Sequence, residues 1–209
     1  MEALVTLYQH PYDPLHPPVC FDEKSYQLLA PTRSPLPMQP GHAQRQDYEY
    51  KREGTRNLCV FVEALAGFRP VLVTQRRPKR DWALALRYLV DVLYPDAEWV
   101  DLVLDNLNTH TDVALVETFG KAAADRIWSR LRLHYTPYHA SWLNMAEIEI
   151  GILSRQCLRR RLPDEQTLAT EIIAWEHWRN TQQAKIHWSF SVEDRRCVFA
   201  EHYSDSLAC

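Results

Sequence analysis

The stretch Trp-Val-Asp-Leu-Val-Leu-Asp, residues 99–105, decides the fold of this 209-residue chain. It is a short apolar run that ends in a carboxylate, which is typical of a strand buried on both faces of a sheet. Between Trp82 and Leu93, apolar residues recur every three or four positions and predict an amphipathic helix before the strand. Helical sequence returns over residues 112–130, with a break near Gly120. A buried strand between two helices indicates an α/β domain.

The remaining elements extend this plan in both directions. Residues 31–41 contain four prolines and a glycine and predict a long loop. The other expected elements are a brief helix within residues 1–18, strands at 19–22, 71–74 and 131–135, a hairpin of 47–51 and 56–63 that turns at Glu53-Gly54, a helix from Trp142 to Arg160 capped by Ser141, a helix capped by Asp164, and a last extended segment at 186–192. Together they predict a mixed sheet flanked by helices, with strand-end aspartates at one edge of the sheet.

The charge balance limits how this chain can meet nucleic acid. Its net charge of −3 differs from that of a stand-alone DNA-binding protein, which is usually basic. The chain therefore either binds DNA weakly or concentrates its cations locally. Arginine-rich clusters occur at residues 76–80, 159–161 and 195–196, and each could equally be a solvated face.

The cysteines and the N-terminus predict a cytoplasmic protein. The five cysteines are scattered, without a Cys-x-x-Cys pair or a histidine at zinc-ligand spacing, so neither a disulfide framework nor a structural zinc is expected. The first residues lack the pattern of a secretion signal, and no apolar run is long enough to span a membrane.

Three acidic residues are the candidate site: Asp22, Asp105 and Glu147. Carboxylates gathered from distant parts of one α/β domain can hold two divalent cations, Mg²⁺ or Mn²⁺, against a phosphodiester. Taken singly, an aspartate at a strand end is more often a helix cap or a turn former. Glu149 is a rival to Glu147, about 200° around the same helix, so the two cannot share a face. Spacing alone does not choose between them.

Several motifs resemble one family. Residues 104–110, Leu-Asp-Asn-Leu-Asn-Thr-His, and residues 134–137, His-Tyr-Thr-Pro, which lead into 141–149, Ser-Trp-Leu-Asn-Met-Ala-Glu-Ile-Glu, closely resemble the catalytic core of IS630-type transposases. These belong to the Tc1/mariner group, whose members have a DDE-type RNase H-like domain. Residues 21–25 resemble the first motif of the family, and the likeness extends over roughly residues 19–199.

The resemblance implies an RNase H-like fold and a site of Asp22, Asp105 and Glu147 with two Mg²⁺ or Mn²⁺ ions. A Leu-Asn-Pro-Ile-Glu string carries the third acid in the related Tc1 pattern, and on residues 143–147 it selects Glu147 over Glu149. The separation of Glu147 from Asp105 is longer than is common in the group. Six further residues could orient these acids or contact DNA, although the first two could equally form a turn: Asn106, His110, Asn144, Arg155, Arg159 and Arg160.

The implied function is metal-dependent DNA strand cleavage and strand transfer of an insertion sequence. Its partners would be transposon ends and target DNA, with TA sites suggested, and two copies of the chain could pair to hold two ends. The protein would work at the nucleoid. Two alternatives stay open: an RNase H-like nuclease without strand transfer, and a non-catalytic remnant or co-opted nucleic-acid-binding module.

The expected domain organisation is a short segment over residues 1–18, the catalytic domain over 19–199 and a tail over 200–209. Transposases of this type carry helix-turn-helix DNA-binding modules ahead of the catalytic domain. Asp22 lies too close to the first residue for such a module to precede it. The expectation is therefore a catalytic domain alone, as a truncated copy or a fragment.

Overall fold

The computed structural model describes residues 1–45, 47–75, 78–105 and 111–190. Its elements follow the expected order: α1 (Glu2–Gln9), β1 (Pro18–Pro31), β2 (Tyr50–Val62), β3 (Val71–Gln75), α2 (Pro78–Tyr88), the π-helical turn η1 (Leu89–Leu93), β4 (Val100–Leu104), α3 (Asp112–Phe119), α4 (Lys121–Trp128), β5 (Leu131–Tyr135), the 3-10 turn η2 (Ser141–Leu143), α5 (Ala146–Gln156) and α6 (Glu165–Thr181). In the part of the chain so described, no helix is long and apolar enough to cross a membrane.

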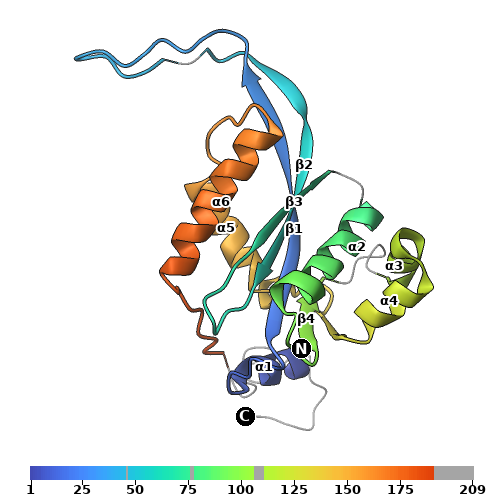
Figure 1. Ribbon diagram of the computed structural model, residues 1–209. Helices are drawn as coiled ribbons and strands as arrows, with labels where there is room; N and C mark the ends of the chain where they lie inside the picture. The colour runs from blue at the N-terminus through green and yellow to red at the C-terminus, as the bar shows by residue number, and fades with distance from the viewer. Residues whose placement is uncertain (46, 76–77, 106–110, 191–209) are drawn as a thin grey trace.

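The strands form one mixed sheet in the order β3-β2-β1-β4-β5 (Figure 1). β1 pairs with β2 antiparallel and with β4 parallel, and β5 extends the parallel half. Parallel neighbours need a crossover, and the helices between β1, β4 and β5 supply it. The predicted mixed sheet is therefore confirmed.

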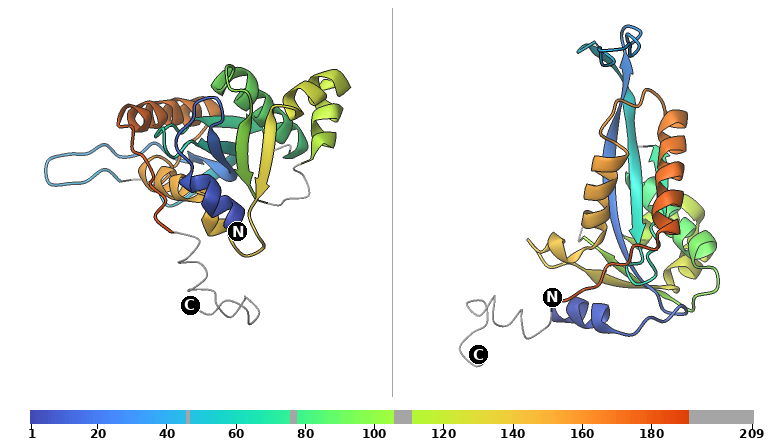
Figure 2. Two further views of the ribbon diagram at one scale, coloured as in Figure 1. Left: turned by 90° about the horizontal axis from the view of Figure 1, so that it is seen from below. Right: turned by 90° about the vertical axis from the view of Figure 1, so that its left-hand side faces the viewer.

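Helices cover both faces of the sheet (Figures 1 and 2). α1, α5 and α6 pack on one face, where Cys20 of β1 and Val103 of β4 join their apolar cluster. α2, α3 and α4 pack on the other face, against Val19 and Phe21. Successive residues of a strand point to opposite faces, so a strand covered on both sides must be apolar throughout. This is why the start of β1 lacks the polar alternation of a surface strand.

The predicted hairpin at Glu53-Gly54 is wrong, because β2 is one continuous strand of 13 residues paired with β1. The register shifts at this point: Gln27 lies opposite Thr55, whereas Leu29 lies opposite Arg52. Gly54 has a φ of 94°, a conformation that a β-bulge and a tight turn both require of glycine. β1 and β2 instead run on together, and the chain between them forms an arm beyond the sheet (Figure 1). The long loop expected over residues 31–41 lies in this arm.

Two other boundaries differ from prediction. Ser141 does not cap α5; it begins η2, and α5 starts only at Ala146, whose N–H donates to Asn144 Oδ1 at 3.2 Å. α5 also ends at Gln156 rather than at Arg160. The cap at Asp164 is confirmed, because its Oδ1 accepts from Thr167 N–H at 2.7 Å. Within the expected last extended segment, residues 186–190 are not part of a strand, and 191–192 lie outside the described residues.

Candidate active site

Asp22 and Asp105 occupy the point where the parallel pair β1 and β4 separates. The last paired residues are Cys20 and Val103, and Asp105 directly follows β4. Asp22 lies two residues beyond Cys20, but β1 does not end there as predicted: it continues to Pro31, and Asp22 lies opposite Val60 of β2. Because β1 continues beyond the end of its parallel partner β4, Asp22 lies near the C-terminal end of β4.

Glu147 reaches the same place from another element. It lies exposed in the first turn of α5, a helix that contacts β1 and β2. The pKa of Asp22 is raised to about 7, chiefly by burial and further by the negative charges of Glu147, Asp105 and Glu23. The Glu23 N–H opposes this rise by donating to Asp22 Oδ1 at 2.7 Å. The charges of Glu147 and Asp105 therefore act at one point, Asp22.

The chemistry of these donors fits hard divalent cations. All three are carboxylates, which Mg²⁺ and Mn²⁺ prefer, and a cation would offset the neighbouring negative charges that add to the effect of burial on the pKa of Asp22. Among the described residues, however, no three His, Cys, Asp or Glu side chains are already arranged so that they could hold a metal ion. The three acids thus suit a divalent cation in their donor type and charge, but their side chains are not preorganised around a metal position.

Two buried polar residues support the acids. Thr136, which follows β5, donates its hydroxyl to Asp105 Oδ1 at 2.8 Å. Asn144 is fully buried and donates from Nδ2 to the carbonyl oxygen of Phe21 at 2.8 Å. Its Oδ1 accepts from Ala146 N–H, so it joins the residue before Asp22 to the residue before Glu147. Asn144 precedes the helix rather than sharing a helical face with Glu147 as expected. Thr136 was missed, although its place just after a predicted strand was a usable signal.

Asn144→Ala is expected to lower the free energy of unfolding by about 1–3 kcal/mol, because the carbonyl of Phe21 and the N–H of Ala146 would lose a buried partner. Chemical denaturation of the purified variant measures this change. Ser141→Ala is the control, because Ser141 is exposed and lies before α5. Equal unfolding midpoints for the wild type and Asn144→Ala would show that the bridge contributes no stability.

Glu149 has different surroundings from Glu147. Its side chain is fully buried, and Oε1 lies 2.7 Å from Arg179 Nη2 and 3.2 Å from Arg69 Nε. Arg69 follows β2 and Arg179 belongs to α6, so the Glu149 side chain is buried where α5 meets these two segments. Of the two glutamates, Glu147 is the one whose charge acts on Asp22.

Residues 17–169 match the family model described as DDE superfamily endonuclease. The chain belongs to the DDE superfamily. A search of curated proteins gives no match. The chain is similar to solved structures of Mos1. The Mos1 strand transfer complex matches with a TM-score of 0.59 and 15% identity, over 98% of this chain and 60% of the Mos1 chain. The Mos1 mariner paired end complex with Mn matches with a TM-score of 0.55 and 16% identity, over 98% of this chain and 61% of the Mos1 chain. The predicted RNase H-like fold is confirmed by this likeness. The chain spans about three fifths of the Mos1 chains.

The arginines expected to contact DNA lie apart from the acids of this DDE domain. Arg155 is exposed in the last turn of α5, about 12 Å along the helix axis from Glu147. Arg159 and Arg160 lie beyond the helix end, and Arg160 pairs with Glu171. The structure does not bring these three to the acids. Asn106 and His110 lie outside the described residues.

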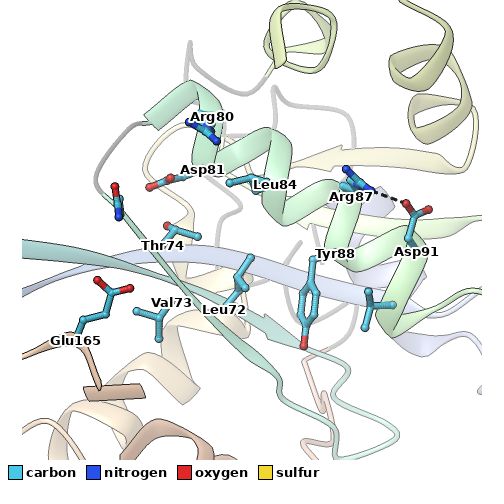
Figure 3. A pocket seen from close by; sticks show the side chains of 12 residues that line it. Leu72, Val73, Thr74, Arg80, Asp81, Leu84, Arg87, Tyr88, Asp91 and Glu165 are labelled. Carbon is cyan, nitrogen blue, oxygen red and sulfur yellow. Dashed lines mark ion pairs between the residues drawn. The ribbon is translucent and has the colours of Figure 1, made fainter. Parts of the chain in front are cut away.

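A cavity of about 560 Å³ lies between β3 and α2 of the DDE domain (Figure 3). Its charged lining is mixed, with Arg87 Nε 3.6 Å from Asp91 Oδ2 and Glu165 facing from α6. None of the three candidate acids lines it. β3 is an edge strand separated from β1 by β2, so this cavity is distinct from the acidic site.

Proposed function

We propose that this chain is the catalytic domain of an IS630-type transposase, which cleaves DNA and joins the cut strand to a target. The observation that carries the proposal is that the charges of Glu147, at the start of α5, and of Asp105, after β4, both act on Asp22 of β1. The family match supports the choice of phosphodiester chemistry. A shared carboxylate site of this kind suits phosphoryl transfer, where catalysis is mostly positioning and charge stabilisation.

In this proposal Asp22 and Asp105 would hold two Mg²⁺ or Mn²⁺ ions, and Glu147 would complete the ligand set from α5. When bound, the ions would lower the pKa of the attacking hydroxyl and stabilise the charge of the leaving oxygen. The hydroxyl of Thr136 orients Asp105, and Asn144 sets the position of the Glu147 turn relative to β1. Water first attacks a DNA phosphate in line and displaces the 3′-oxygen, which takes up a proton, so the strand ends are a 3′-hydroxyl and a 5′-phosphate. That hydroxyl then loses its proton, attacks a target phosphate and displaces the 3′-oxygen of the target strand, without a covalent enzyme intermediate.

DNA is the proposed partner. The similar structures are described as a Mos1 strand transfer complex, a paired end complex and a pre-cleavage transpososome. By extension we propose transposon ends and TA-containing targets as substrates, and a homodimer that holds two ends at the nucleoid. Residues 19–199 would form the catalytic domain, with residues 1–18 packed on it through α1 and residues 200–209 as a tail.

Incubation with supercoiled plasmid at low salt tests the proposal. With Mn²⁺ the chain is expected to produce nicked circles, and EDTA or the Asp105→Ala substitution should abolish them. Asp96→Ala is the matched control, because Asp96 is exposed and outside the acidic site. A labelled oligonucleotide end added to the reaction should become joined to the plasmid. Nicking without joining would favour the nuclease alternative, and neither product would favour the non-catalytic one.

A further inference from the structure

Tyr138 projects from the loop between β5 and η2, close to the acidic site. Its side chain is 90% exposed, the largest fraction among the exposed large hydrophobic side chains of the described residues. Its ring contacts the ring of His139, with centroids 4.1 Å apart at an interplanar angle of 65°. A ring exposed to this degree has most of its surface available to a ligand, and an aromatic ring gains stability when it is covered.

The backbone under Tyr138 is strained and held at both ends. The N–H of Ala140 donates to the carbonyl oxygen of Pro137 at 2.9 Å, which closes a four-residue turn. Within it His139 has a φ of 61°, a left-handed conformation that favours glycine. Thr136 and Ala140 on either side are buried, at 7% and 2% exposed. Strain of this kind persists where surrounding structure imposes it, and it is often associated with function.

The position and charge of this turn suit a nucleotide. Tyr138 is two residues from Thr136, which bonds Asp105, so their Cα atoms lie at most about 7 Å apart. The tyrosine ring can therefore reach a nucleotide adjoining a phosphate at Asp105. Residues 136–146 contain no Asp or Glu, so the turn itself adds no negative charge that would repel a phosphate backbone.

Trp142 is the neighbouring aromatic and a rival for this role. It is 43% exposed, and its ring stacks on Trp188 with centroids 6.1 Å apart at 14°. Phe190 meets the same indole edge-on at 5.7 Å. Protein rings already occupy contact positions around Trp142, so Tyr138 is the better placed to accept a base.

We propose that Tyr138 stacks on an unstacked nucleobase next to the scissile phosphate. This inference rests on the proposed function, because it takes the phosphodiester at Asp105 as given. Stacking on an aromatic side chain tolerates any base, since every base has a π-face, and it stabilises a displaced nucleotide. Tyr138 would thus hold the cut strand in register with the acids.

Nicked duplex oligonucleotides that carry 2-aminopurine on either side of the nick test the stacking. Binding by the wild-type chain with Mn²⁺ is expected to quench the fluorescence at one of these positions. Tyr138→Leu should lose the quench and weaken binding, measured by anisotropy, by about 10-fold. Tyr138→Phe should keep both, because it retains the ring. Tyr48→Leu is the matched control, an exposed tyrosine (83%) on the arm.

The outcomes separate this inference from the proposed function. If the wild type nicks plasmid, and Tyr138→Leu quenches the 2-aminopurine fluorescence and binds the duplex as the wild type does, the stacking role is wrong but the proposed function stands. If the wild type neither nicks plasmid nor binds any duplex, the proposed function and the stacking role both fail. Circular dichroism of Tyr138→Leu verifies that the fold is intact, as expected for so exposed a side chain.

Discussion

Glu147→Gln is expected to reduce plasmid nicking by more than about 100-fold, because changes to residues that only orient a metal ligand already cost about 10- to 100-fold. The amide keeps the shape of the side chain but removes the negative charge that would hold a cation. Glu147 is exposed in the first turn of α5, so the thermal unfolding midpoint should stay unchanged. Nicking rates with Mn²⁺ and a thermal melt of the same preparation measure both expectations.

Glu49→Gln provides the matched control for Glu147. Glu49 is an exposed glutamate on the arm, away from Asp22 and Asp105, and its replacement should change neither nicking nor melting. Wild-type nicking by Glu147→Gln would show that another residue supplies the third carboxylate. The assignment of the site would then have to be revised at α5.

Glu149→Gln is expected to lower the free energy of unfolding by about 3–5 kcal/mol, the usual cost of breaking a buried ion pair. The substitution would leave Arg69, which is fully buried, and Arg179 without the anion that lies between them. Burial lowers the pKa of Arg69 and the charge of Glu149 opposes that shift, so the guanidinium depends on this carboxylate. Denaturant titration of the variant measures the loss.

An exposed ion pair offers the comparison for Glu149. Glu165 Oε2 lies 2.6 Å from Arg56 Nε, with the side chains 46% and 23% exposed, and Glu165→Gln should cost no more than about 1 kcal/mol. Glu149→Gln should also retain nicking at temperatures where it stays folded, because Glu149 has no contact with the other acids. Loss of nicking by a fully folded Glu149→Gln, with nicking kept by Glu147→Gln, would reverse the roles of the two glutamates.

Local sequence was sufficient wherever a pattern has only one physical solution. The short, mostly apolar run of residues 99–104 predicted a strand covered on both faces, and β4 is buried along its whole length. Asp164 followed by a helical stripe at Leu168, Ile172 and Trp175 predicted α6 and its cap correctly. The break at Gly120 separates α3 from α4 as expected.

Prediction failed where one local signal has two solutions. Gly54 supplies a positive φ, which a hairpin turn and a β-bulge need equally, and the pairing of β2 with the whole of β1 selects the bulge. Ser141 is a good helix cap by residue type, yet the chain first forms η2, and the N–H of Ala146 bonds Asn144 instead. In both cases the deciding partner is far away in the sequence: β1 pairs with the strand that contains Gly54, and the carbonyl oxygen of Phe21 holds Asn144.

By itself the sequence determined the alternation of helices and strands, the place of Asp105 after β4 and, through its motifs, the family. Only the tertiary structure decided what surrounds each acid. Helical periodicity separates Glu147 from Glu149, but it cannot say which of them meets Asp22 and which meets Arg69 and Arg179. That difference arises because electrostatic energy depends on distances between segments, and those distances exist only once α5 and α6 are both packed on the sheet.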